Sequence, residues 1–160
     1  MKKLLIVTGP QGSGNHLFAR LFSLHENVVG WESLHDKYWV PSDQEPFARF
    51  WVHPEELTKE HFDKGDYFCA NVSVPFFFDG VRQTPKIKEV AMRAFELGVM
   101  PIIAVIVRDR NINELQQVRV GVSVQWILPL SITKTWQYTS LIMKHFFYTK
   151  KSILNILVVF

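Results

Sequence analysis

A run of glycines near the N-terminus has the residue types and spacing needed to hold an anion. Residues 9–16 read GPQGSGNH, so three glycines lie within six residues. Glycines allow successive backbone N–H groups to converge on one phosphate, and the N-terminus of a following helix adds the positive end of its dipole. The pattern predicts a phosphate-binding loop made by Gly9, Gln11, Gly12, Ser13, Gly14, Asn15 and His16. The alternative is a tight strand-to-helix turn that binds no ligand.

The spacing of this loop matches G-x-x-x-x-G, the P-loop pattern, in which Lys and then Ser or Thr follow the last glycine. Here Asn15 stands at the position of the lysine and His16 at the position of the residue that binds Mg²⁺. Asparagine supplies no charge, and Mg²⁺ prefers oxygen ligands. Phosphoryl transfer depends mostly on positioning and on charge neutralisation, so an ordinary ATPase or kinase is expected to be crippled by these residues.

Two branches of the P-loop superfamily resemble this segment. Residues 13–17, SGNHL, resemble the 5′-phosphosulfate loop of sulfotransferases, and GPQGSG resembles the N-terminal loop of small nucleotide kinases. Sulfotransferases usually carry Lys or Arg just before the Ser-Gly pair, where this chain has Gly12. The first resemblance implies 3′-phosphoadenosine 5′-phosphosulfate as sulfate donor, and the second implies ATP with Mg²⁺. A third hypothesis is a non-catalytic module that keeps the loop and has lost the chemistry.

Arg108 follows a wholly apolar segment, PIIAVIV, that is typical of a buried strand. The C-terminal ends of parallel strands line the ligand crevice of an α/β sheet, and an arginine there can hold a phosphate with two hydrogen bonds. In the sulfotransferase resemblance, Arg108 matches the arginine that grips the 3′-phosphate of the donor, while the Pro, Asp and Ser expected after it are replaced. The alternative is a surface arginine paired with Asp109 or Glu114.

Glu32 and His35 are the candidate catalytic residues. They follow a short apolar segment, 28–31, whose end is expected to open on the same side as the glycine loop. Either side chain is able to act as a general base that takes a proton from a substrate hydroxyl. The alternative is a solvated turn. The other histidines have no spacing typical of metal ligands, so no metal site is assigned.

The pattern of apolar segments predicts the fold class. Strands made of apolar residues throughout, alternating with helices, favour an α/β fold with a mainly parallel sheet, and the resemblance implies a P-loop-type, three-layer domain. Expected strands are 4–8, 28–31, 67–74 and 101–107, and expected helices are 15–25, 85–97 and one beginning at 112. A capping-box pattern at Ser42–Glu45 predicts a short helix through Trp51, and 54–62 is a candidate for another.

The last quarter of the chain differs in composition from the rest. All 15 acidic residues lie at or before Glu114. The sequence therefore predicts an α/β core, 1–118, followed by an acid-free basic and apolar segment, 119–160. Three interpretations stay open: this segment adds the last elements of the same sheet, it forms a basic surface for membrane or nucleic acid, or it is a non-native tail produced by a frameshift.

Composition also limits which partners and which cellular compartment are expected. One cysteine among 160 residues excludes an internal disulfide framework. The uncharged stretch 120–133 contains Pro129 and is shorter than the roughly 20 apolar residues that span a bilayer. We therefore expect a cytoplasmic protein without a transmembrane segment. Its expected partners are a nucleotide and an unknown acceptor substrate, with no nucleic acid and an undetermined oligomeric state.

Overall fold

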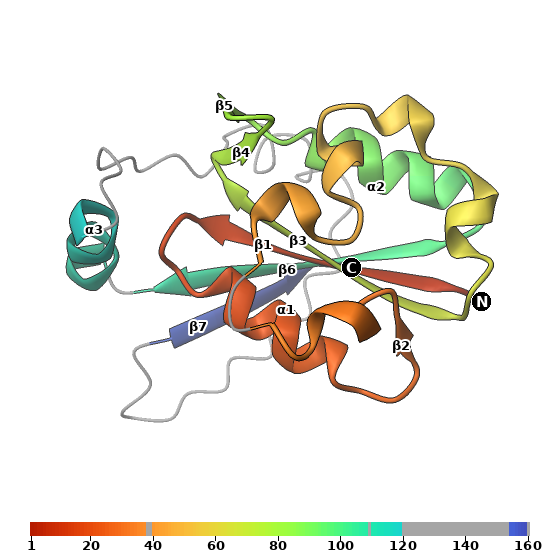
Figure 1. Cartoon of the computed structure of the whole chain (residues 1–160), viewed down its shortest axis with the longest axis horizontal. Coiled ribbons are helices and arrows are strands. Elements are labelled where there is room, and N and C mark those ends of the chain that lie inside the picture. Colours follow the sequence, from red (N-terminus) through yellow and green to blue (C-terminus); the bar gives the residue numbers. More distant parts are fainter. Residues whose placement is uncertain (38–39, 109, 120–153, 160) are drawn as a thin grey trace.

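The centre of the protein is a five-stranded sheet in the order β2-β3-β1-β6-β7 (Figure 1). The computed structural model describes residues 1–37, 40–108, 110–119 and 154–159. Strands β2, β3, β1 and β6 are parallel, and β7 is antiparallel to β6. The mixed α/β class and the mainly parallel sheet predicted from the sequence are confirmed. The elements are β1 (Lys3–Pro10), α1 (Asn15–Ser23), β2 (Val28–Val29), β3 (Tyr67–Val74), β4 (Phe76–Phe78), β5 (Val81–Gln83), α2 (Ile87–Glu96), β6 (Met100–Arg108), α3 (Arg110–Arg119) and β7 (Leu154–Val159).

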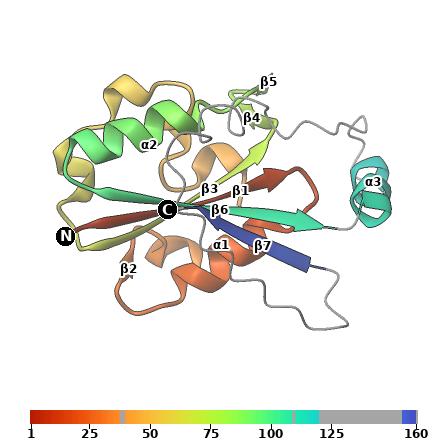
Figure 2. The same ribbon diagram turned by 180° about the vertical axis from the view of Figure 1, so that it is seen from behind.

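Helices cover the sheet on both faces, which explains why the central strands are apolar throughout. Figures 1 and 2 show α1 on one face of the sheet and α2 on the other. Side chains alternate along β1, so Leu4 and Ile6 pack with α2, whereas Val7 packs on the α1 side with Ala19. The described residues therefore form three layers around two apolar clusters.

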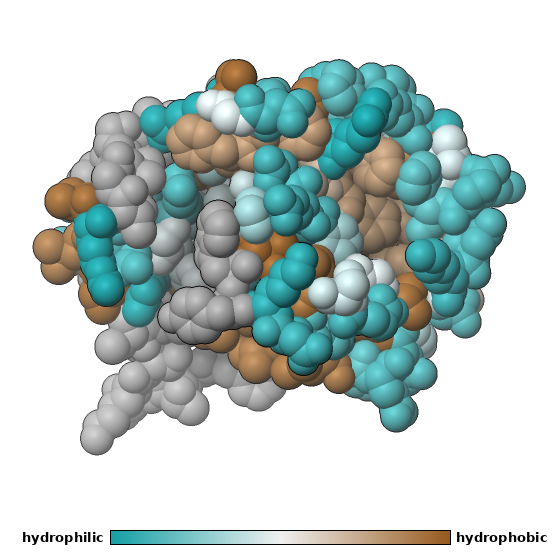
Figure 3. Space-filling model, viewed as in Figure 1, coloured by the Kyte–Doolittle hydropathy of each residue, from teal (hydrophilic) through white to brown (hydrophobic). Residues whose placement is uncertain are grey.

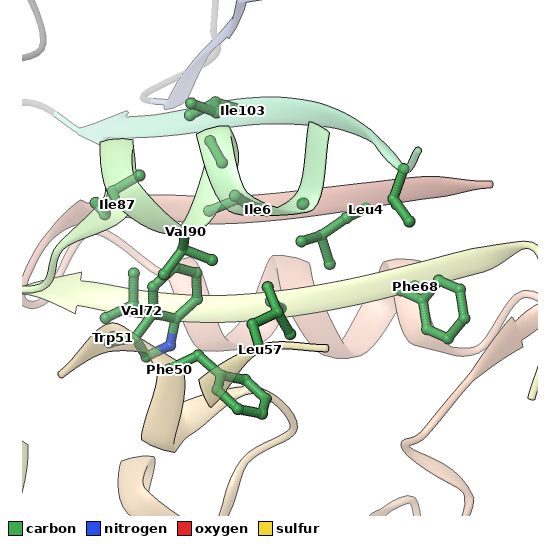
Figure 4. Close-up of a cluster of buried hydrophobic side chains, with 14 of the residues drawn as sticks. Leu4, Ile6, Phe50, Trp51, Leu57, Phe68, Val72, Ile87, Val90 and Ile103 are labelled. Atoms are coloured by element: carbon green, nitrogen blue, oxygen red, sulfur yellow. The ribbon is translucent and has the colours of Figure 1, made fainter. Parts of the chain in front are cut away.

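The larger cluster lies between the sheet and α2 (Figure 4). Trp51, Leu57 and Phe62 come from the 3₁₀ segments before β3 and are at most 1% exposed. Val90 of α2 is fully buried against the same strands. Burial of each such side chain contributes on the order of 1.5–3 kcal/mol, so this cluster holds the sheet rigid behind the loops at its edge.

The segment between β2 and β3 differs from the prediction. The helices expected over 42–51 and 54–62 are four short 3₁₀ helices instead: η2 (Ser42–Gln44), η3 (Ala48–Trp51), η4 (Pro54–Glu56) and η5 (Lys59–Phe62). A fifth, η1 (Glu32–Leu34), follows β2. Glu45 is extended because Pro46 follows it, and the residue before a proline disfavours the helical conformation. The Ser42 hydroxyl donates to the carbonyl oxygen of Phe77 at 3.1 Å, so the expected capping box does not form.

The C-terminal segment contributes to the same sheet. β7 pairs antiparallel with β6, with Ile103 opposite Val159 and Arg108 opposite Leu154. Residues 120–153 and 160 lie outside the described residues, so the division at 118/119 and the origin of the tail stay predictions. Among the described residues, no helix has both the length and the apolar character needed to span a membrane.

The outer face of α1 is apolar. Leu17, Leu21 and Leu24, spaced one helical turn apart, are 60%, 53% and 65% exposed. Figure 3 shows this apolar surface below the centre of the view, where Figure 1 places α1. Within the described part of the chain, α1 thus contributes its inner face, around Ala19, to the core.

Cys69 offers a test of the packing between β3 and α1. Its side chain is 1% exposed, and its thiol lies 3.7 Å from the carbonyl oxygen of Ala19. Burial raises the pKa of the thiol to about 12, and the Glu45 carboxylate adds to this shift. Since the thiolate is the reactive form, we expect almost no alkylation of the native protein by iodoacetamide at about pH 8 and complete alkylation in urea, measured by mass spectrometry. Because the chain has one cysteine, rapid native labelling would contradict this packing.

Candidate functional site

The C-terminal ends of the parallel strands meet at one edge of the sheet. Figure 1 shows the loop after β1, the β4–β5 hairpin and α3 gathered at this edge. The register places Gly9 of β1 opposite Ser73 of β3, so the glycine loop and the end of β3 lie side by side. This is the edge at which open α/β sheets bind their ligands.

The glycine loop leaves β1 through a tight turn. The Ser13 amide donates to the Pro10 carbonyl at 3.1 Å, and Gly12 has a φ of 87°, the left-handed value that the third residue of a type II turn requires. Gly14 then precedes α1 with a φ of 102°. At Gly9, an added Cβ would fall inside contact distance of the Ile106 carbonyl oxygen of β6. The loop therefore needs glycine at these positions for its shape and its close approach to the sheet.

Asn15 holds the loop in this shape. It is 3% exposed, and its Oδ1 accepts from the Ser13 hydroxyl at 2.6 Å. Its Nδ2 donates to the Gly9 carbonyl at 3.0 Å and to the Ser73 hydroxyl at 3.3 Å. The sequence predicted Asn15 as a ligand-binding residue; the structure uses its side chain inside the protein, where it ties the loop to β1 and β3. Ser13, 1% exposed, is likewise engaged within the loop.

The start of α1 is an uncapped helix N-terminus. Gly14 is the N-cap residue and has no side chain, and α1 has no side-chain cap hydrogen bond. The first backbone bond of the helix runs from Phe18 to Gly14 at 3.2 Å. The amides of residues 14–17 accordingly have no partner within the helix, because the first four N–H groups of any α-helix lack one. N–H donors at the positive end of the helix dipole are suited to an anion.

A hydrogen-bonded chain of His16, Glu45 and Asn71 lies next to these amides. His16 Nδ1 is 2.6 Å from Glu45 Oε1, and Asn71 Nδ2 donates to Glu45 Oε2 at 2.7 Å. Glu45 and Asn71 are each 5% exposed. His16 Nε2 and Asn71 Oδ1 are buried and have no hydrogen-bond partner among the described residues. Unpaired buried polar atoms are uncommon, and they often mark a place where a ligand or an ordered water binds.

The sequence pattern did not identify Glu45, Asn71 and Ser73 as candidate site residues. Glu45 was interpreted as part of a capping box, which explains its spacing from Ser42 but not its burial. Asn71 and Ser73 lie in YFCANVSV and face α1, as does Cys69 two residues before Asn71. The usable signal was the pair of polar residues near the end of an otherwise apolar strand, because a parallel strand covered on both faces has no solvated side on which to place them.

Helix α3 closes the outer side of the loop. Gln117, 3% exposed, donates from Nε2 to the Gln11 carbonyl oxygen at 2.9 Å. The side-chain oxygen of Gln11, Oε1, is buried and has no partner among the residues that the structure describes. Gln11 is therefore held through its backbone, and its side-chain oxygen is left to accept a further hydrogen bond.

Glu32, a predicted catalytic base, lies away from this cluster. β2 is only two residues long, and Val29 pairs with Phe68, five residues before Ser73, which corresponds to about 16 Å along the strand. The Glu32 carboxylate accepts from the Gly30 amide at 2.9 and 3.0 Å. Hydrogen bonds from the backbone amides of Glu32 itself and of Gly30 lower the pKa of this carboxyl, which makes it a weaker base.

His35, the other predicted base, is at the far end of α1. Its Nε2 lies 3.4 Å from the hydroxyl of Ser23, the last residue of the helix. Eight residues of helix, about 12 Å, separate Ser23 from Asn15. The structure does not bring Glu32 and His35 to the glycine loop. The expectation that the loop after β2 opens beside it fails because β2 ends early, and the carboxylate and imidazole that do lie there are Glu45 and His16.

Arg108 is the last residue of β6 and is exposed. Thr8 pairs with Val105, three residues before it, so Arg108 extends past the strand edge on the side of the glycine loop. Asp109, one of its alternative partners, lies outside the described residues. The role of Arg108 as a phosphate ligand stays a prediction.

Comparison with known proteins adds no relative. No protein-family model, curated protein or solved structure matches this chain. Within the described ranges, no group of three or more His, Cys, Asp or Glu side chains is arranged to hold a metal ion.

Proposed function

We propose that the chain binds a phosphorylated nucleotide at the glycine loop and acts as a group transferase, most similar in loop chemistry to sulfotransferases. The observation that carries the proposal is the uncapped start of α1, where the amides of residues 14–17 follow a loop held in place by Asn15. A Ser, Thr, Asp or Asn side chain at the N-cap would occupy one of these amides, whereas Gly14 leaves them open at a cost of only about a few tenths of a kcal/mol.

The environment of Asn15 and His16 favours a sulfotransferase-like function over a kinase-like one. Asn15 is uncharged, and its side-chain amide is already hydrogen-bonded to Gly9, Ser13 and Ser73. His16 is hydrogen-bonded to Glu45 and brings no hydroxyl oxygen to a Mg²⁺ ion. Sulfuryl transfer needs no metal, whereas ATP-dependent phosphoryl transfer uses one to neutralise developing charge.

A 3′-phosphorylated adenine nucleotide fits part of this edge. The loop amides would hold the 5′-phosphate end, and the exposed guanidinium of Arg108 would hold the 3′-phosphate in two hydrogen bonds. The donor supplies an activated sulfate when bound, and the chain supplies orientation and charge. The cation that sulfotransferases carry before the Ser-Gly pair has no equivalent at Gly12, so this chain must find positive charge elsewhere.

A thermal-shift panel tests the proposal. We expect 3′-phosphoadenosine 5′-phosphate to raise the melting temperature without Mg²⁺, because a ligand that binds only the folded state stabilises it by mass action. At a ligand concentration 100 times its Kd, the gain is about 2.7 kcal/mol. ATP, ADP and GTP, each with and without Mg²⁺, form the comparison. A Mg²⁺-dependent shift with ATP alone would favour the kinase-like alternative.

Two variants test whether the nucleotide-induced thermal shift depends on the glycine loop and on Arg108. Gly14→Asp places a negative charge at the start of α1 and should abolish the shift, while Arg108→Ala should reduce it for the 3′,5′-bisphosphate and leave a 5′-monophosphate unaffected. Arg49→Ala is the matched control, since Arg49 pairs with Glu56 in the 3₁₀ region away from the loop. No shift with any nucleotide or with sulfate would contradict ligand binding at the loop and would leave a structural turn.

A further inference from the structure

A pocket of about 320 Å³ lies at the edge of the sheet opposite the glycine loop (Figure 1, at the end marked N). It is formed where β1, β3 and β6 begin, and η5 and the turn after α2 complete its walls. The length of β1 from Lys3 to Pro10, about 23 Å, separates the pocket from the glycine loop. Pockets that hold small molecules measure about 300–1,000 Å³, so this one is suited to a ligand at the small end of that range.

Hydrogen bonds hold the walls of the pocket in place. The Lys3 amide donates to the Asp66 carbonyl oxygen at 2.7 Å, and the Met100 amide donates to the Lys2 carbonyl oxygen at 2.9 Å. The Lys2 ammonium group donates to the Phe62 carbonyl oxygen. The beginnings of the three strands and the end of η5 are therefore joined to one another, as is typical of a pocket that exists before its ligand arrives.

The inner surface of the pocket is apolar. Phe62 and Val99 line it and are each 1% exposed, and Leu97 packs against the larger apolar cluster. These side chains belong to the rigid core between the sheet and α2. An apolar part of a ligand would lose contact with water against them, which favours binding.

The remaining side chains around the pocket include two positive and two negative groups. The Lys2 ammonium group lies 3.9 Å from the carboxylate of Asp63, so these two charges balance each other. Lys59 and Asp66 also line the pocket and are exposed. Neither side chain has a hydrogen bond or an ion pair with any of the described residues. One positive and one negative group thus remain to contact a ligand.

We infer that this pocket binds a small zwitterion with an apolar body, which is the chemistry of an apolar amino acid. Lys59 contacts the carboxylate of the ligand, Asp66 contacts its ammonium group, and the apolar part lies against Phe62 and Val99. Hydrogen bonds between charged groups are the strong ones, so both contacts contribute to selection. A nucleotide or a sulfate ion brings only negative charge and is repelled by Asp66. The inference therefore adds a second site, and it does not depend on the function proposed above.

Calorimetric titration of the full-length chain with L-leucine tests the inference, together with two analogues that each lack one charge. 4-Methylpentanoate keeps the carboxylate and the apolar body but has no ammonium group, and L-leucinamide keeps the ammonium group but has no carboxylate. We expect L-leucine to bind about tenfold more tightly than either analogue, because each analogue leaves one charged group of the pocket without its hydrogen bond.

Two variants match each charge of the ligand to its partner in the pocket. Asp66→Asn should weaken binding of L-leucine about tenfold and leave that of 4-methylpentanoate unchanged. Lys59→Gln should weaken binding of L-leucine about tenfold and leave that of L-leucinamide unchanged. Lys88→Gln and Glu89→Gln are the matched controls, at exposed positions of α2 outside the pocket, and should bind all three probes as the wild type does.

Three results would overturn the inference: no binding of any probe, equal affinity for all three probes, or an affinity for L-leucine that Asp66→Asn or Lys59→Gln leaves unchanged. The two sites lie at opposite ends of β1, so their tests are independent. Binding of L-leucine without any response to nucleotides would contradict the proposed function alone. A response to nucleotides without binding of L-leucine would contradict this inference alone.

Discussion

Replacing Gly9 with alanine is expected to lower the free energy of unfolding by about 3 kcal/mol, because the added methyl group has no space. Its Cβ would press on the backbone carbonyl oxygen of Ile106 and lie 2.8 Å from Asn15 Oδ1 and 2.9 Å from Ser13 Oγ. A backbone carbonyl in the central sheet cannot rotate away as a flexible side chain does. Urea unfolding followed by circular dichroism measures the loss, and ligand-induced thermal shifts should fall with it.

Gly98→Ala is the matched control for this substitution. Gly98 follows α2 with a φ of 83°, and an added Cβ there meets nothing within 4 Å. Its substitution carries only the cost of a left-handed backbone, about 1 kcal/mol. If Gly9→Ala is no more destabilising than Gly98→Ala, the loop does not approach β6 as closely as the structure has it.

Local pattern was enough to predict the sheet and its layers. The apolar segments 4–8, 67–74 and 101–107 are the centres of β1, β3 and β6, and the helix expected over 85–97 is α2, starting at Ile87. These elements are decided by side-chain periodicity, which is a local property. The irregular stretch from Ser42 to Phe62 was predicted wrongly, because there propensity for helix competes with Pro46, Pro54 and long-range contacts.

The residues of the candidate site were likewise predictable only where they lie close together in the sequence. The glycine loop was visible because its shape needs particular residues close together in sequence. The Glu45–Asn71 contact joins residues 26 positions apart, and no local rule pairs them. Glu32 and His35 were predicted as catalytic residues on the assumption that every strand extends to the edge of the sheet where the glycine loop lies. The short β2 does not, since only Val28 and Val29 pair with β3.

Exchanging Asn15 for aspartate is expected to cost about 3 kcal/mol at neutral pH, although the two side chains have nearly the same shape. In the wild type, Nδ2 donates to the Gly9 carbonyl at 3.0 Å, whereas an aspartate oxygen there would face another acceptor. Burial and the carbonyl dipole would raise the pKa of the new carboxyl above its unfolded value. The loss should therefore be largest above the folded pKa and shrink as pH falls from the folded pKa towards the lower, unfolded pKa.

Unfolding in urea at about pH 7 and about pH 4 measures this dependence, because the protonated acid can again donate to the carbonyl of Gly9. Asn27→Asp, at an exposed position between α1 and β2, is the control and should change stability by no more than about 0.5 kcal/mol. A loss for Asn15→Asp that equals the control would mean that residue 15 points outward, as a lysine in a P-loop would. A large loss that recovers in acid would mean that the Asn15 side-chain amide shapes the loop from within, so that any positive charge offered to a ligand must come from another residue.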